Sequence, residues 1–349
     1  NVPNLQAMGL GNIIPLKGLA AVDAPTGSCG KCTLKSDGKD TTTGHWEMAG
    51  IILKQGFPKF PDGFPPRIID EFVTKAKVPG ILGNVPASGT EIIKQLGLEH
   101  IRTGKPIVYT SADSVFQIAA HEEVVPLDRL YEMCEIARNI LHGDDEVARV
   151  IARPFLGSTA ENFKRTENRH DYAVPPPAGN LLPLLKGAGL DVVCVGKIAS
   201  IYDGMGVTED LTAKNNEQVI DVTIKALNAD TTGLIFCNLV DFDMLYGHRR
   251  DTEGYAKALE RFDTRLPEII DALNDDDLLI MTADHGNDPT KEGSDHTREY
   301  VPLLVFGKTA AQGVKLGTRQ SLSDIGQTIA ENFGLAIDDG VSFLVDIST

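Results

Sequence analysis

The sequence predicts an α/β protein in which a mostly parallel sheet lies between helices, with a second, smaller α/β domain inserted into the first. Two observations support this prediction. Beyond residue 180, short apolar runs alternate with segments of helical periodicity, and this alternation is typical of a parallel sheet whose strands are joined by helical crossovers. Two proline-rich stretches, at 56–66 and 174–180, interrupt the chain, and such stretches end regular structure and form stiff connectors.

The elements of the C-terminal half follow one another in a regular order. Apolar runs at 191–195, 234–240, 278–281 and 301–306 predict strands. The run at 234–240 is apolar throughout, as a strand buried on both faces requires. Helical spacing predicts a helix over 216–227 and another that contains Tyr255, Leu259, Phe262 and Leu266. A last helix is expected over 321–333, with a serine near its start and Gly334 just past its end.

The two proline-rich stretches also suggest the domain boundaries. We expect residues 1–62 and 175–349 to form one core domain, and residues 63–174 to form an inserted α/β cap that is entered and left through paired hinges. The alternative is a single domain that carries two proline-rich loops.

The composition limits the classes of function. The chain has 349 residues, of which 42% are hydrophobic and 23% charged, and a formal net charge of −16. So acidic a protein is a poor candidate for binding nucleic acid or an anionic membrane through its overall field. A phosphorylated substrate is compatible with this charge if the site holds its own divalent cations, because such ions dominate the local field.

The five cysteines are odd in number, which argues against a disulfide framework in a chain of this length. Cys194 and Cys237 lie in apolar runs and are expected to be buried. Cys29 and Cys32 form a lone C-x-x-C, which could serve a redox or zinc role but has no partner pair elsewhere. No run of ~18 apolar residues and no signal-peptide pattern is visible.

Acids and histidines follow two of the predicted strands, where sites form in open α/β sheets. Asp243 and His248 come after the run at 234–240, Asp284 and His285 come after the run at 278–281, and His296 lies in a polar loop beyond. Imidazole and carboxylate together are ligands for Zn, Mn or Fe. Five ligands are too many for one catalytic ion with an open position, so they predict two ions.

Three further acids of these loops are weaker candidates as metal ligands. Asp241 could orient a ligand or could be an ordinary loop carboxylate, and Asp288 and Asp295 are expected to be loop acids.

Three successive hydroxyls, Thr41 to Thr43, occupy a polar turn within Gly38–Glu47 (GKDTTTGHWE). A threonine hydroxyl becomes a useful nucleophile when metal coordination lowers its pKa, and a turn that leads into a helix offers amides to a phosphate. The alternative is an ordinary helix cap built from Asp and Thr. A two-metal site nearby favours the nucleophile.

Three long motifs of this chain resemble those of bacterial phosphopentomutases, which belong to the alkaline phosphatase superfamily. They are Gly38–Glu47, Asp241–Asp251 (DFDMLYGHRRD) and Thr282–Pro289 (TADHGNDP). The resemblance runs from Asn1 to the C-terminus in order and includes an inserted cap. It implies an alkaline-phosphatase-like core, and an enzyme that interconverts ribose 1-phosphate, or its 2-deoxy form, and ribose 5-phosphate.

The resemblance also implies a cofactor set and roles for the site residues. It implies two Mn²⁺ ions, a phosphothreonine at Thr41, with Thr43 as the second choice, and a hexose or pentose bisphosphate as activator. One ion would be held by Asp243, His248 and His296. The other would be held by Asp284 and His285, with the Thr41 oxygen as a further ligand.

The implied substrate contacts lie elsewhere in the chain. Ser111 and Asp113 match a stretch that contacts the sugar, and Arg149 and Lys197 are candidates for contacts to the distal phosphate or sugar, although either could be a surface cation. The resemblance further implies a cytoplasmic monomer that acts on small pentose phosphates, with no nucleic-acid or membrane partner.

The chain departs from the family pattern at one place. The family carries one more metal-ligating Asp on its first strand, upstream of the Pro3-Asn-Leu motif, and no residue here takes that place. The competing hypotheses are a metal-dependent phosphatase or phosphodiesterase on the same core, and a cofactor-independent phosphoglycerate mutase, for which a serine nucleophile would be expected. A non-catalytic cation-binding module is the alternative of another class.

Overall fold

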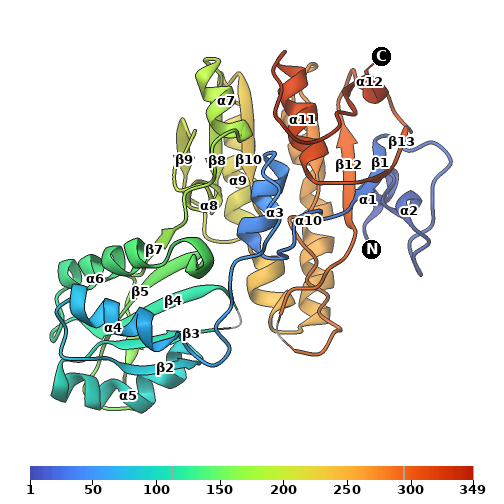
Figure 1. Ribbon diagram of the computed structural model, residues 1–349. Coiled ribbons are helices and arrows are strands. Elements are labelled where there is room, and N and C mark those ends of the chain that lie inside the picture. Colours follow the sequence, from blue (N-terminus) through green and yellow to red (C-terminus); the bar gives the residue numbers. More distant parts are fainter. Residues whose placement is uncertain (112, 294, 349) are drawn as a thin grey trace. The chain divides into compact units, whose positions relative to one another are not determined.

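The computed structural model describes residues 1–111, 113–293 and 295–348. The chain divides into two compact units (Figure 1), of which the first comprises Asn1–Gly56 with Pro175–Thr349, and the second comprises Phe57–Val174. Each unit has its own sheets and its own core, so each is described by itself.

The first unit holds two sheets. Its helices and strands are α1 (Pro3–Ala7), α2 (Leu10–Ile13), β1 (Ser28–Cys32), α3 (Thr41–Met48), α7 (Leu181–Gly187), β8 (Asp191–Val195), α8 (Ile198–Ile201), β9 (Glu209–Leu211), α9 (Asn216–Leu227), β10 (Gly233–Cys237), the π-helical turn η2 (Phe242–Gly247), α10 (Thr252–Ala272), β11 (Leu279–Met281), β12 (Val301–Phe306), β13 (Lys315–Arg319), α11 (Ser323–Asn332) and α12 (Leu344–Ile347).

The two sheets of this unit differ in strand direction. Strands β10, β8 and β9 form a parallel sheet in that order. In the other sheet, ordered β11-β12-β1-β13, strand β12 is antiparallel to both neighbours while β1 and β13 are parallel. Helix α11 contributes to the core on one face, and α1 and α10 contribute to the core on the other. Most strand pairs are therefore parallel, as predicted, and β12 is the exception.

Strands β10 and β11 each lie at a sheet edge, and this corrects one expectation. The predicted strand at 234–240 was expected to be buried on both faces, but β10 ends at Cys237 and all five of its residues are only partly buried. Within residues 1–111, 113–293 and 295–348, strand β10 pairs with β8 alone and β11 pairs with β12 alone. Residues of both strands line one cavity of about 1010 Å³. Their apolar side chains lack a neighbouring strand on that side, which explains their partial exposure.

The second unit is a six-stranded sheet with helices on both faces. Its elements are α4 (Pro66–Lys75), β2 (Leu82–Pro86), α5 (Gly89–Thr103), β3 (Ile107–Thr110), β4 (Val115–His121), α6 (Leu127–Ile140), the short helix η1 (Gly143–Asp145), β5 (Arg149–Leu156), β6 (Lys164–Arg165) and β7 (His170–Ala173). The strand order is β2-β3-β4-β5-β6, and β7 also pairs with β5. Helices α4 and α6 pack on one face and α5 packs on the other.

Cys194 is buried, as expected, whereas Cys237 is only partly buried because β10 is partly exposed. Cys29 and Cys32 are both buried in β1, and residues three apart in a strand point to opposite faces. Burial raises the pKa of Cys29 and raises that of Cys32 to about 12. A buried thiol with a raised pKa is a poor nucleophile and metal ligand, so this C-x-x-C has no redox or zinc geometry.

Among the described residues, no helix is both long and apolar enough to cross a bilayer.

Candidate metal centre

Helix α3 begins at Thr41, and its cap separates the three hydroxyls. The Asp40 carboxylate accepts hydrogen bonds from the Thr43 amide at 3.1 Å and from the Thr43 hydroxyl at 2.7 Å. Thr43 is fully buried by this arrangement. The Thr41 hydroxyl takes no part in the cap and lies 3.4 Å from Nε2 of His285. The helix cap and the candidate nucleophile are therefore different residues of the same turn. The turn can serve as an ordinary helix cap and also carry a nucleophile, so these two interpretations of the sequence are compatible.

The turn η2 brings Asp243 and His248 together. The His248 amide donates to the Asp243 carbonyl at 3.0 Å, which is the i→i+5 bond of a π-helical turn, and such turns are frequent at functional sites. Nε2 of His248 lies 3.3 Å from Oδ2 of Asp243.

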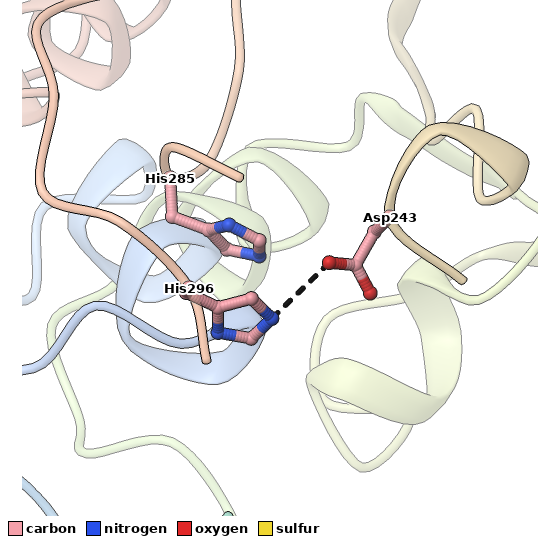
Figure 2. Close-up of side chains that lie close together, drawn as sticks. All are labelled: Asp243, His285 and His296. Atoms are coloured by element: carbon pink, nitrogen blue, oxygen red, sulfur yellow. Dashed lines mark ion pairs between the residues drawn. The ribbon is translucent and has the colours of Figure 1, made fainter. Parts of the chain in front are cut away.

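The loop after β11 carries His285 and His296 to the same place. Nε2 of His296 lies 3.1 Å from Oδ1 of Asp243 and 3.1 Å from Nε2 of His248. The rings of His285 and His296 are tilted by 30° to each other, with their centroids 3.9 Å apart. Figure 2 shows Asp243, His285 and His296 turned toward one another, with the ion pair between Asp243 and His296 dashed. Each of these three residues offers one ligand atom within 4.8 Å of the others.

Asp284 joins the same cluster from the end of β11. Its Oδ2 lies 3.3 Å from Nε2 of His285 and 3.1 Å from Nδ1 of His45. The five candidate ligands and the Thr41 hydroxyl thus form one continuous group, in which His285 and His296 link the two halves.

The donor set fits divalent cations. Nε2 of His248 and Nε2 of His296 face each other at 3.1 Å. For a hydrogen bond between two neutral imidazoles, one of these nitrogens must be unprotonated and accept the bond. Converging imidazole nitrogens and carboxylate oxygens are the ligands of Zn, Mn and Fe sites.

The two carboxylates are held in their charged form. Burial opposes the ionisation of Asp243, but hydrogen bonds from His248 and His296 outweigh it and hold its pKa well below the usual range. Burial likewise opposes the ionisation of Asp284, but the charges of His285 and His45 outweigh it and lower its pKa. Carboxylates that are ionised at neutral pH are ready ligands for a cation.

His45 and Gly44 connect α3 to the end of β11. Nδ1 of His45 lies 2.8 Å from the Thr41 carbonyl and within ion-pair distance of Asp284. Burial opposes protonation of His45, but the Asp284 carboxylate outweighs it and raises the pKa of the imidazole. The sequence analysis missed His45, although its place four residues after Thr41, on the same helix face, was a usable signal.

Replacing Gly44 with alanine should disturb this contact. A Cβ on Gly44 would lie 1.9 Å from the Asp284 carbonyl oxygen, so α3 would have to move away from the strand end. We expect Gly44→Ala to destabilise the protein by at least ~1–3 kcal/mol in thermal or urea unfolding. The matched control is Gly187→Ala, because nothing lies within 4 Å of a Cβ there. Equal stabilities of the two variants would contradict the packing argument.

Arg250 and Asn287 hold together the loops that carry the candidate ligands. The Arg250 guanidinium donates to Oδ1 of Asn287 at 2.9 Å and to the carbonyl oxygens of Gly247, Asp288, Gly293 and Asp295. Asn287 in turn donates to Oδ1 of Asp243 at 2.5 Å. A partner that orients a ligand in this way tunes the affinity for the metal.

Removing the Asn287 amide should weaken metal binding while the ligands remain. We expect Asn287→Ala to lower the affinity for Mn²⁺ by about 10- to 100-fold, measured by titration of the metal-free protein. Asn228→Ala is the control, because in the described part of the chain the Asn228 side chain bonds only to the Ile224 carbonyl at the end of α9. Unchanged affinity in Asn287→Ala would show that Asp243 does not need this partner.

The three acids that were weaker candidates for metal ligands have other partners. Asp241 exchanges hydrogen bonds with Asn216 at the start of α9. Asp288 accepts from Thr290, and Asp295 pairs with Lys39 at 3.0 Å. Asp288 and Asp295 lie in the loop beyond β11, and their role as loop acids stays a prediction.

The predicted substrate contacts are distributed over both units. Ser111, Asp113 and Arg149 belong to the second unit, where Ser111 accepts from the Asp113 amide at 3.3 Å and Arg149 lies 3.6 Å from Asp171. Lys197 is exposed just after β8 in the first unit. Ala112 and Ser294, which belong to the quoted motifs, lie outside the described residues.

Comparisons with known proteins identify a family model and relatives that match nearly the whole chain. A model of the metalloenzyme superfamily matches residues 1–337. A phosphopentomutase of Caldanaerobacter subterraneus subsp. tengcongensis is 57% identical over 347 residues, which cover 99% of this chain and 88% of that protein. A phosphopentomutase of Desulfitobacterium hafniense is 55% identical over 348 residues, which cover 99% and 89%. The solved structure of the PH0037 protein from Pyrococcus horikoshii covers 97% of this chain and 92% of that chain, with 15% identity and a TM-score of 0.49.

Proposed function

This chain belongs to the phosphopentomutases of the metalloenzyme superfamily, and on that premise we propose that it moves a phosphoryl group between the 1- and 5-oxygens of ribose or 2-deoxyribose through a phosphothreonine at Thr41. Membership of the family makes it an enzyme, an intramolecular phosphotransferase that acts on a small sugar phosphate.

One observation carries the choice of Thr41. Of the two hydroxyls considered, only that of Thr41 is directed at the cluster, at 3.4 Å from His285 Nε2, while that of Thr43 is used by the cap. Thr41 is also the first residue of α3, where free amides and the helix dipole favour a phosphate.

The residues divide into two sets of ligands under this proposal. Asp243, His248 and His296 would hold one ion, and Asp284, His285 and the Thr41 oxygen would hold the other, with Mn²⁺ as the proposed metal. When bound, such ions lower the pKa of a coordinated hydroxyl and neutralise the charge of the transferring phosphoryl group.

The protein's own residues then account for the two transfers. The resting enzyme carries a phosphoryl group on Thr41, supplied at the start by a hexose or pentose bisphosphate. The 5-hydroxyl of ribose 1-phosphate attacks this phosphorus, the bond to the Thr41 oxygen breaks, and the hydroxyl proton passes to water. The ribose bisphosphate so formed turns around or is exchanged. The Thr41 oxygen then attacks the phosphorus at the 1-position, and the sugar oxygen leaves and takes up a proton. Phosphothreonine is restored and ribose 5-phosphate is released.

The proposed sugar contacts are Ser111, Asp113, Arg149 and Lys197. Positioning of this kind supplies much of the rate in phosphoryl transfer, and exclusion of water separates a mutase from a phosphatase.

The function is tested by following two products at once. The protein is incubated with Mn²⁺, a trace of glucose bisphosphate and ribose 1-phosphate, and both ribose 5-phosphate and free phosphate are measured. We expect ribose 5-phosphate with little free phosphate. Free phosphate as the main product would contradict the proposal and identify a metal-dependent phosphatase on the same core.

A further inference from the structure

The segment that leads into the candidate nucleophile has no regular structure of its own. Residues 33–40, here called the β1–α3 segment, lie in neither a helix nor a strand, and Thr41 follows directly as the first residue of α3. The backbone groups of such a segment need hydrogen-bond partners from elsewhere in the fold. The way in which these groups are held therefore affects how precisely the Thr41 hydroxyl is placed, 3.4 Å from Nε2 of His285.

A buried carboxylate of α3 holds two amide groups of the β1–α3 segment. Oε1 of Glu47 accepts from the Lys35 amide at 2.8 Å, and Oε2 accepts from the Ser36 amide at 2.6 Å. Glu47 is fully buried, and its Oε1 also accepts from the Leu322 amide at 3.0 Å, just before α11. The amide side of the segment is thus fixed by the same helix that begins at Thr41.

One side chain, Arg298, holds four carbonyl groups of the β1–α3 segment. Its Nη1 donates to the carbonyl oxygens of Leu34 at 3.2 Å and Ser36 at 3.1 Å. Its Nη2 donates to those of Asp37 at 2.5 Å and Gly38 at 2.9 Å. The two Nη nitrogens carry four N–H groups, which is one for each carbonyl. Over the residues that the structure describes, no carboxylate pairs with this guanidinium, so the carbonyl dipoles are what it binds.

Arg298 belongs to the stretch of chain that carries the candidate ligand His296. Thr297, which lies between them, donates its amide to the Gly286 carbonyl at 2.8 Å and so anchors this stretch to the loop after β11. Lys39 makes a second link, since its Nζ donates to the His296 carbonyl. Two cationic side chains therefore join the β1–α3 segment to the stretch that carries His296.

We propose that Arg298 is a positioning residue for phosphoryl transfer, which fixes the Thr41 hydroxyl relative to the candidate metal ligands by holding the carbonyls of the β1–α3 segment. This role rests on the proposed function, in which Thr41 is the nucleophile. Arg298 acts through the backbone that leads into α3, not on the reacting atoms. The planar guanidinium suits several fixed acceptors at once, whereas a lysine ammonium is a point charge on a flexible stem.

Hydrogen exchange tests the hold on the segment without turnover. The amides of Lys35, Ser36 and Asp37 are all hydrogen-bonded, so their exchange reports local opening of the segment. We expect Arg298→Ala to raise their exchange rates about tenfold or more and to leave those of 216–227 in α9 unchanged. This variant should fold, because Arg298 is exposed. Equal exchange in the variant and the unchanged protein would overturn the proposal.

Kinetics test whether this hold places the nucleophile. A displacement of about 1 Å can cost about a hundredfold in rate, so we expect kcat of Arg298→Ala to fall about tenfold to a hundredfold. KM and the affinity for Mn²⁺ should be largely kept, since no proposed sugar contact or metal ligand is removed. Arg298→Lys should recover part of kcat. The control is Arg261→Ala, which removes an exposed guanidinium that donates to Glu217 on the same unit and should leave kcat unchanged.

The outcomes separate this role from the others. Faster exchange with an unchanged kcat would overturn the positioning role. A loss of Mn²⁺ affinity as large as the loss of kcat would also overturn it, because Arg298 would then act on the metal ligands and not on Thr41. If the unchanged protein had no mutase activity, the proposed function would fall, while the exchange rates would still decide whether Arg298 holds the β1–α3 segment.

Discussion

Replacing Thr41 with alanine should abolish mutase turnover, with a loss of at least about a thousandfold. The variant keeps the metal ligands and the Asp40 cap but lacks the oxygen that lies 3.4 Å from His285. Without a nucleophile neither transfer can occur, so the loss should fall on kcat rather than on substrate binding. Conversion of ribose 1-phosphate measures the loss, and titration with Mn²⁺ should show that metal binding is largely kept.

Thr43→Val is the matched control, since it deletes a hydroxyl two residues away without changing the shape of the side chain. Its hydroxyl bonds to Asp40 at 2.7 Å, so we expect a loss of stability of about 1 kcal/mol and activity close to that of the unchanged protein. The opposite pattern, in which Thr43→Val is inactive and Thr41→Ala is active, would transfer the nucleophile to Thr43.

The second large effect is expected from Asp243→Asn. Asp243 contacts His248 at 3.3 Å and His296 at 3.1 Å, and it is the carboxylate common to both histidines. Asparagine keeps the size of the side chain but loses the charge, so the affinity for Mn²⁺ should fall by at least about a hundredfold. This loss is larger than the one expected for Asn287→Ala, which removes only a hydrogen-bond partner of the ligand. Activity should fall with it and recover partly at high Mn²⁺. Calorimetric titration and activity at several Mn²⁺ concentrations measure both.

Asp241→Asn is the control that separates the loss of the Asp243 carboxylate from a general effect of removing a negative charge from this motif. Asp241 lies two residues away and bonds to Asn216 at the start of α9. We expect normal metal affinity in this variant. If Asp241→Asn and Asp243→Asn lost metal equally, the cluster would not be the centre that these distances indicate.

Much of the first unit could be predicted because its elements carry local signals. The helix predicted over 216–227 is α9, and the strand predicted over 301–306 is β12. The Asp and His residues of two distant segments meet because each follows a strand end. The antiparallel direction of β12 has no local signal, since it depends on which neighbours a strand finds.

The residues that support the cluster were harder to predict. His45 and Asn287 look like ordinary helix and loop residues until α3 and the loop after β11 are seen in contact. The partial exposure of β10 likewise depends on its lack of a second neighbour, which a wholly apolar run does not reveal.

Mapping the phosphorylated residue tests the central claim most directly. The protein is incubated with Mn²⁺ and glucose bisphosphate, digested, and its peptides are sequenced by mass spectrometry, with Thr41→Ala treated in parallel. We expect one phosphoryl group on Thr41, and no phosphopeptide in Thr41→Ala. A phosphoryl group on another residue, or turnover of ribose 1-phosphate with none on Thr41, would contradict it.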